Sequence, residues 1–169
     1  MKYLFLILII CLFNTSSQNP ATSQFISSFK LLKLDAKYEI KGFLKPSNLS
    51  ADFNGDGKPD AAMLVIEKKT KKKGIMLIQG GGTRYFVFGA GTKFGDGGDN
   101  YSWLNGWQVY KEKIAYETVL DKNGDLADGK KVVLKRPALY VYQLEDGEPN
   151  SGGIIYWDGK KYIWIQQGE

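Results

Sequence analysis

The sequence predicts a mainly β fold, an antiparallel meander arranged as a blade-like unit or a small sandwich, with one short helix near the N-terminus. Three observations lead to this prediction. The 169 residues include 20 glycines, ten tyrosines, nine phenylalanines and four tryptophans, a composition that favours strands over helices. Short apolar runs recur along the chain. Nearly every connection between them carries Gly, Asn or Asp, so successive strands follow one another through tight turns and pair antiparallel.

The N-terminus has the plan of a secretory signal peptide over residues 1–17. One lysine precedes an apolar run over residues 3–13 and a polar exit made of small residues, and the run is too short to span a membrane. We expect cleavage after Ser17 and a secreted or periplasmic mature protein. The second alternative is a lipoprotein anchored through Cys11, although Ile10 stands where a lipoprotein signal has a small residue.

Residues 18–24 are polar and predict a short tether, and residues 25–169 predict a single β-rich domain. Phe25, Ile26, Phe29 and Leu32 recur at helical spacing, which predicts a short amphipathic helix at the start of the domain. Alternating or compact apolar runs predict the strands. They cover residues 37–43, 61–66, 74–79, 85–88, 114–120, 131–134, 138–144, 153–157 and 161–165.

The sequence has no histidine, and its single cysteine lies in the predicted signal. Ser/His/Asp and Cys/His catalytic sites, His/Cys zinc sites, haem ligated through His or Cys, and a disulfide within the mature chain are therefore excluded. The chemistry left to the chain suits metals bound through oxygen, and we expect no enzyme. A hydrolase built on paired carboxylates is the alternative, with Glu67, Glu112, Glu117 and Asp128 as candidates that the sequence does not pair.

The most informative segment, residues 52–60, reads Asp-Phe-Asn-Gly-Asp-Gly-Lys-Pro-Asp. Oxygen side chains at relative positions 1, 3, 5 and 9, a backbone carbonyl at position 7 and glycine at position 6 follow the ligand order of an EF-hand calcium loop. Gly57, at position 6, is expected to take a positive φ that wraps the chain around the ion. Position 12 is Met63, in a strand-like run, so we expect a calcium loop between two strands. The candidate metal ligands are Asp52, Asn54, Asp56, the carbonyl of Lys58, and Asp60.

Electrostatic repulsion gives this loop a reason to bind a cation. The carboxylates of Asp52, Asp56 and Asp60 are expected to repel one another by roughly 3 kcal/mol per pair at ~5 Å and an effective dielectric constant of ~20. A bound Ca²⁺ removes that cost. The alternative is an Asx-rich turn that holds no ion.

The unit of residues 49–66, a strand followed by the 52–60 loop and a second strand, resembles the calcium loops of FG-GAP and VCBS-type repeats. These repeats occur in integrin-like propellers and in many exported bacterial proteins. The resemblance implies that the five candidate ligands bind Ca²⁺. Residues 88–91, Phe-Gly-Ala-Gly, are similar to the family's Phe-Gly/Gly-Ala-Pro signature, but they follow the loop and lack the proline. A propeller needs ~4–8 blades, so the resemblance implies one blade-like unit within a small domain.

Two other acidic turns are candidates for a second ion. Asp121, Asn123 and Asp125 repeat the first three ligand positions, although Asn-Gly is also a strong hairpin signal. Asp96 and Asp99 lie in a glycine-rich loop, for which a solvated turn is the alternative.

The basic stretch of residues 68–73, in a chain of net charge +5, joins two apolar runs. It is interpreted as a solvated turn that blocks edge-to-edge strand pairing, with contact to an anionic polymer or lipid as the alternative. No nucleic-acid partner is expected, since no RNA-binding signature is present.

Aromatic residues are numerous in the second half of the chain. Tyr101, Trp103 and Trp107, together with a predicted C-terminal hairpin over residues 154–165 that turns at Asp158, are interpreted as core or, alternatively, as a platform for sugar rings.

These patterns together predict an exported calcium-binding β domain whose metal loop is structural, a non-catalytic binding or envelope-associated module. Its expected partner is a macromolecule or glycan at the cell envelope, and no segment after the signal is long and apolar enough to span a membrane. The alternative is a carbohydrate-active protein, either glycan-binding or a carboxylate-based hydrolase.

Overall fold

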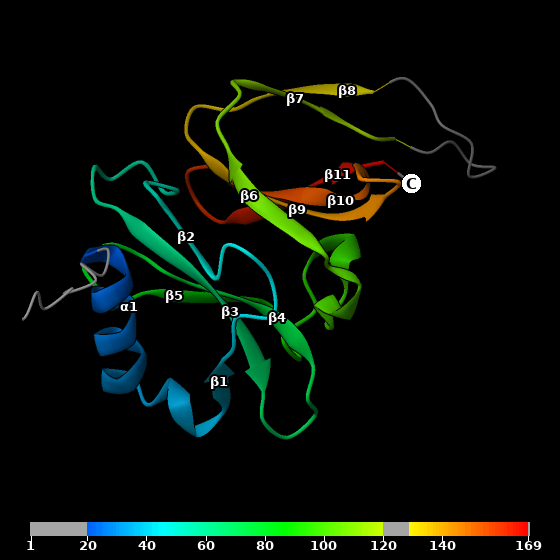
Figure 1. Ribbon diagram of the computed structural model, residues 1–169. Helices are drawn as coiled ribbons and strands as arrows, with labels where there is room; N and C mark the ends of the chain where they lie inside the picture. The colour runs from blue at the N-terminus through cyan, green and yellow to red at the C-terminus, as the bar shows by residue number, and fades with distance from the viewer. Residues whose placement is uncertain (1–19, 120–128, 169) are drawn as a thin grey trace, which may run out of the picture.

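The computed structural model describes residues 20–119 and 129–168, in which two antiparallel sheets face each other (Figure 1). The first sheet has the order β1-β3-β4-β5, with β2 also paired to β3. Its strands are β1 (Tyr38–Ile40), β2 (Asn48–Ala51), β3 (Asp60–Glu67), β4 (Lys73–Ile78) and β5 (Tyr85–Gly89). The second sheet has the order β11-β10-β9-β6. Its strands are β6 (Gly106–Tyr110), β9 (Ala138–Glu145), β10 (Glu148–Trp157) and β11 (Tyr162–Gln167). The predicted mainly β, antiparallel fold is confirmed, as a small sandwich.

The central strands β3 and β4 are buried on both faces, which explains their continuous apolar sequences. Leu64 packs in one cluster with Val141 and Ile155 of the second sheet. Its neighbour Val65 packs in another cluster with Phe25 of the helix α1 (Pro20–Leu31). Because successive side chains of a strand point to opposite faces, a strand between two covering layers needs apolar residues at every position.

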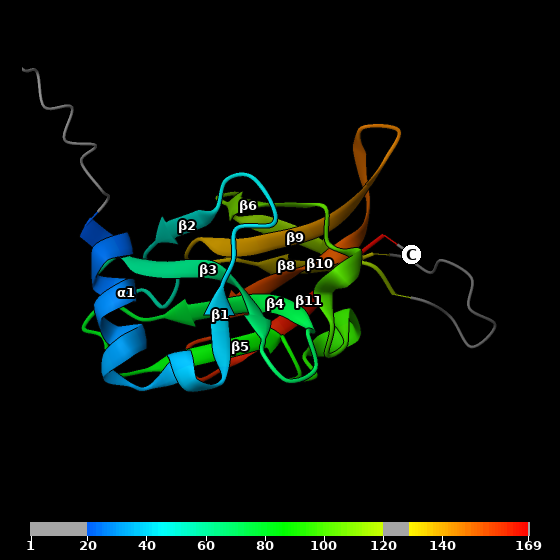
Figure 2. The same cartoon turned by 60° about the horizontal axis from the view of Figure 1, so that its bottom comes forward.

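Helix α1 covers the outer face of the first sheet (Figure 2). Its buried residues Ala21, Phe25, Ser28 and Phe29 are spaced by three or four positions or adjoin one another and form one stripe. The predicted tether is therefore corrected: residues 20–24 are the first turns of the helix, and their polar side chains lie beside this narrow stripe. Proline is well suited to the first helical position, because its missing N–H has no helical partner there.

The interior between the sheets is rich in aromatic side chains. Tyr101 is 0% exposed and Trp107 is 2% exposed, and both belong to the inner cluster. The Nε1–H of Trp107 donates a hydrogen bond to the carbonyl of Pro46 at 2.7 Å. These two residues are core, which corrects the alternative in which they form part of a surface platform.

A separate hairpin of β7 (Ile114–Glu117) and β8 (Lys130–Val133) lies over the outer face of the second sheet (Figure 1). Ala115 and Leu134 of this region pack with Ile154, Tyr156 and Ile165 of β10 and β11. The structure thus stacks a helix, two sheets and a hairpin. None of the helices in the described residues is long and apolar enough to cross a membrane.

Short 3₁₀ turns complete the chain where it passes between regular elements. They are η1 (Leu34–Ala36), η2 (Gly95–Gly97) and η3 (Tyr101–Trp103). Both η2 and η3 lie in the connection from β5 to β6, where the chain crosses from the first sheet to the second (Figure 1). The predicted signal peptide, including Cys11, lies outside the described residues.

Packing of α1 is expected to contribute strongly to stability. Phe25→Ala removes a side chain that is 1% exposed, and such a substitution typically lowers the free energy of unfolding by about 3–5 kcal/mol. Leu31→Ala, on the same helix but 77% exposed, is the control and should change it by about 0.5 kcal/mol or less. Urea denaturation followed by tryptophan fluorescence measures both. Equal effects would show that α1 does not cover the sheet in solution.

Candidate metal-binding loop

The 52–60 loop connects β2 to β3 at one edge of the first sheet. Its second residue, Phe53, is 1% exposed and packs in the inner core, so the loop is anchored by an apolar side chain. Gly55 and Gly57 have φ values of +77° and +85°. The positive φ predicted for Gly57 is confirmed, and a glycine is needed there because L side chains rarely adopt this conformation.

The first candidate ligand, Asp52, organises the outer half of the loop. Its Oδ1 accepts hydrogen bonds from the backbone N–H groups of Gly55 at 2.7 Å and Asp56 at 3.0 Å. Its Oδ2 accepts from the N–H of Gly57 at 2.9 Å. One carboxylate therefore gathers three consecutive backbone donors, and it curls the chain around itself.

Asn54 and Asp56 form a second set of contacts. The amide Oδ1 of Asn54 accepts from the N–H of Asp56 at 2.9 Å, and its Nδ2 donates to Asp56 Oδ2 at 3.1 Å. Asp56 Oδ1 accepts from the N–H of Lys58 at 2.9 Å. Hydrogen bonds from Lys58 and then from Asn54 hold the pKa of the Asp56 carboxyl below its ordinary value.

The ninth-position carboxylate, Asp60, faces inward. It is 0% exposed, and its Oδ2 accepts from the N–H groups of Phe53 at 2.9 Å and Asn54 at 3.2 Å. Its Oδ1 accepts from the N–H of Gly80 at 2.7 Å, in the turn after β4. Burial raises the pKa of Asp60 to about 6, against the lowering effect of these three hydrogen bonds.

Arg136 ties the loop to the second sheet. Its Nη1 donates to the carbonyl of Asn54 at 2.8 Å, and a Cβ added to Gly55 would lie 3.1 Å from its Nε. Arg136 precedes β9 by two residues. The loop thus contacts both sheets where they meet at one end of the sandwich.

The donor set suits a hard cation such as Ca²⁺, which prefers oxygen ligands. A carboxylate offers about four acceptor positions, and donors in the described part of the chain take three on Asp52, two on Asp56 and three on Asp60. Within the described residues, each of these carboxylates therefore keeps an acceptor position. No three acidic, histidine or cysteine side chains converge as a metal group within residues 20–119 and 129–168. The Asn54 amide and the Lys58 carbonyl would therefore have to complete the ligand set.

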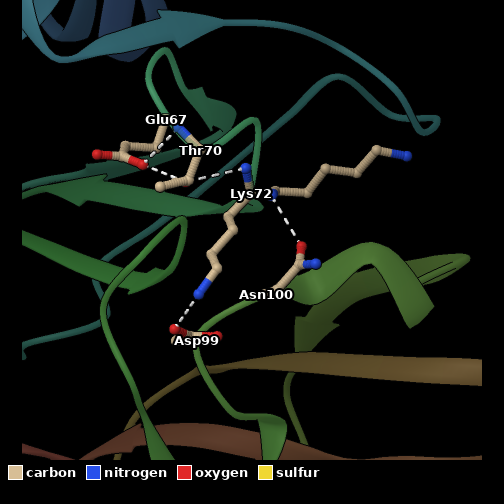
Figure 3. Close-up of polar contacts among 6 residues, drawn as sticks. Glu67, Thr70, Lys72, Asp99 and Asn100 are labelled. Carbon is tan, nitrogen blue, oxygen red and sulfur yellow. Dashed lines mark hydrogen bonds and ion pairs between the residues drawn. The ribbon is translucent and has the colours of Figure 1, made fainter.

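The glycine-rich acidic loop is docked onto the basic turn between β3 and β4 (Figure 3). Lys72 Nζ pairs with the carboxylate of Asp99, and the N–H of Lys73 donates to Asn100 Oδ1 at 3.0 Å. Asp99 is thus engaged with an ammonium group, whereas Asp96 is exposed. The other candidate second site, Asp121, Asn123 and Asp125, lies outside the described residues.

Two of the candidate catalytic carboxylates, Glu67 and Glu117, have structural partners, whereas Glu112 is exposed. Glu67, 8% exposed, accepts from the N–H and hydroxyl of Thr70 in the basic turn (Figure 3). The Thr70 hydroxyl is the main cause that holds the pKa of Glu67 below its ordinary value. Glu117 pairs with Lys130 across the β7–β8 hairpin at 3.1 Å. Asp128 lies outside the described residues.

A pocket of about 310 Å³ adjoins the loop, and Asn54, Asp56, Gln79, Thr83, Arg84 and Trp157 line it. The guanidinium of Arg84 lies over the rings of Trp157, at 5.5 Å, and Phe86, at 5.6 Å. Sequence reasoning did not single out Arg84. It lies in the short connection between β4 and β5, and only the folded sheet brings it to Trp157.

Comparisons with known proteins identified no relative of this chain. No family model matches the chain. Searches of curated proteins and of solved structures gave no match either.

The raised pKa of Asp60 predicts a pH dependence of stability in calcium-free solution. The folded state binds this proton more tightly than the unfolded state, since the pKa rises from 3.8 to about 6 on folding. The stabilisation that protonated Asp60 gives the folded state is fully present below about pH 3.8 and is lost as the pH rises through about 6. The free energy of unfolding attributable to Asp60 is therefore expected to increase as the pH falls from about 6 to about 4.

Urea denaturation with a chelator present, repeated across this pH window, measures the effect. Asp60→Asn should remove the increase that the wild type shows. Asp158→Asn is the control, because hydrogen bonds from Lys161 and Lys160 lower the pKa of Asp158 and its titration lies below the window. A wild-type profile that matches Asp60→Asn would contradict this account of Asp60.

Proposed function

We propose that the chain is an exported, calcium-stabilised β domain that acts by binding at the cell envelope and not by catalysis. The observation that carries the proposal is the position of the 52–60 loop. Its oxygen ligands follow the order of a calcium loop, and its glycines have the required positive φ. The loop is also hydrogen-bonded to Gly80, after a strand of the first sheet, and to Arg136, before a strand of the second sheet.

The proposed calcium ligands are the side chains of Asp52, Asn54, Asp56 and Asp60 and the carbonyl of Lys58. A bound Ca²⁺ supplies positive charge that offsets the repulsion among these carboxylates. The protein's own part is to hold the loop curled, which Asp52 does through three backbone N–H groups. The ion thus adds to a turn that is already formed.

A binding role is supported by what the acidic side chains contact. Asp60 holds backbone N–H groups, Glu67 holds Thr70, and Asp99 and Glu117 pair with lysines. These carboxylates are used to fasten turns and strands to one another. Glycosidic chemistry needs two carboxyl groups that face a substrate across ~5 Å or ~6.5–9.5 Å, and these contacts serve a different purpose.

Calcium is expected to raise the melting temperature of the wild-type protein. Extracellular calcium modules bind with Kd of ~10⁻⁴–10⁻³ M, and at ten times Kd mass action adds about 1.4 kcal/mol to the free energy of unfolding. For a domain of this size, that free energy corresponds to a rise in melting temperature of roughly a few degrees. Magnesium should do much less, because it releases its water reluctantly. Differential scanning calorimetry with calcium, magnesium or chelator measures the shifts.

Two variants locate the calcium effect. Asp56→Ala should remain folded and lose the calcium response. Asp158→Ala is the matched control, since Asp158 also accepts backbone N–H groups in an exposed turn, from Lys160 at 2.7 Å and Lys161 at 2.9 Å, but lies outside the loop. If the wild type and Asp56→Ala melt alike with and without millimolar calcium, the loop is an Asx-rich turn and the proposal fails.

A further inference from the structure

The inner face of the second sheet becomes polar at one end. Alternate residues of a strand share a face. In β9 the inward-facing residue after Val141 is therefore Gln143, and in β11 the one after Trp164 is Gln166. In β10 a bulge precedes Ser151 and leaves it opposite Gln143. Such bulges often redirect side chains beside functional sites. Three neighbouring strands thus carry polar side chains where the sandwich core would otherwise continue.

These polar residues line a pocket of about 310 Å³ between the sheet edge and the η2–η3 connection. Its walls include the indoles of Trp103 and Trp164 and the side chains of Asp96, Gln143, Ser151 and Gln166. This volume is at the lower end of the ~300–1,000 Å³ typical of small-molecule sites. It has room for a ligand of about one sugar ring.

Some polar groups of the pocket already form hydrogen bonds within the protein, and others do not. Trp103 Nε1–H donates to the carbonyl of Gly97 at 3.1 Å, and Trp164 Nε1–H donates to Gln166 Oε1 at 2.7 Å. The indoles therefore offer apolar surface only. The side chains of Asp96, Gln143 and Ser151 make no hydrogen bond to other residues within the described parts of the chain, so they are available to a ligand.

Trp164 is held in place before any ligand arrives. A Cβ added to Gly95 would lie 2.3 Å from its indole, and one added to Gly153 would lie 2.2 Å from it. The indole also lies edge-to-face with Phe94 and Tyr101, at centroid distances of 6.3 and 6.4 Å. A wall fixed by its neighbours costs less conformational entropy on binding than a mobile one.

We propose that this pocket binds a neutral sugar ring. A sugar ring presents apolar C–H groups, which suit the indoles, and hydroxyls that both donate and accept, which suit the carboxamide of Gln143 and the hydroxyl of Ser151. A wholly apolar ligand would leave these groups unpaired, which is costly in a desolvated site. An anionic ligand would meet the carboxylate of Asp96 with no lysine or arginine among the described residues of the walls.

This inference rests on the proposed function in taking the chain to be a binding domain, but it does not depend on calcium. The test is a two-dimensional ¹⁵N NMR titration with maltohexaose, cellohexaose and chitohexaose at millimolar concentration. The chain has four tryptophans, and each gives one indole N–H signal that a Trp→Phe variant assigns. At least one sugar is expected to shift the signals of Trp103 and Trp164 and to leave that of the buried Trp107 in place.

A matched pair of variants tests the polar contacts. Gln143→Ala removes one hydrogen-bonding side chain from the pocket and should weaken binding by roughly three- to tenfold. Gln108→Ala is the control, because Gln108 is also an exposed glutamine on a strand of the same sheet, in β6, and should leave the apparent Kd unchanged. Melting temperatures of both variants show whether each is folded.

Repeating the titration with chelator and with Asp56→Ala separates this inference from the calcium proposal. Sugar binding that persists in both supports the pocket whatever the loop does. The inference is overturned if none of the three sugars shifts the two signals, if the shifts centre on Trp157 beside the 52–60 loop, or if only an anionic sugar such as hexagalacturonate binds. It is also overturned if Gln143→Ala and Gln108→Ala bind alike.

Discussion

The hydrogen bonds accepted by the carboxylate of Asp60 hold the 52–60 loop, the first sheet and the turn after β4 together. From the first residue of β3 this carboxylate accepts the N–H groups of Phe53, Asn54 and Gly80, so one buried side chain fixes the loop and the turn after β4 together. Asn54, held in this way, presents its carbonyl to Arg136. A buried N–H that loses its acceptor costs about 1–3 kcal/mol. This position therefore requires an acceptor for structural reasons, separately from any cation.

In the proposed calcium site, the ion would add to a turn that the chain's own hydrogen bonds already form. In many metal loops the ligands repel or remain mobile until the ion arrives. Here the curl is set by Asp52 and by two glycines at positive φ, and the inner end is set by Asp60. A proposed ion would have to share oxygens that already accept hydrogen bonds, so the affinity that we expect is the modest one of extracellular modules.

The sequence was informative wherever the controlling contacts are local. The nine residues of the loop contain their own acceptors, donors and glycines, so the turn and the sign of φ at Gly57 were predictable, whereas Arg136 is 82 residues from Asn54 and no pattern connects them. The strand β6 was not predicted, although its sequence contains Trp107, Val109 and Tyr110, residue types that favour strands. The proposed sugar pocket depends on the register of three strands, so Gln143 alone carried no signal in the sequence.

The fit between Trp164 and its glycine neighbours has an evolutionary consequence. Gly95 and Gly153 come from a loop and a strand far apart in the chain, yet each leaves space that the same indole fills, and a Cβ added to Gly97 would lie 3.0 Å from it. A larger residue at any of these positions would displace the ring, and a smaller residue at position 164 would remove the reason for the glycines. Homologous chains should therefore vary at these positions in concert, with glycine retained wherever tryptophan is retained.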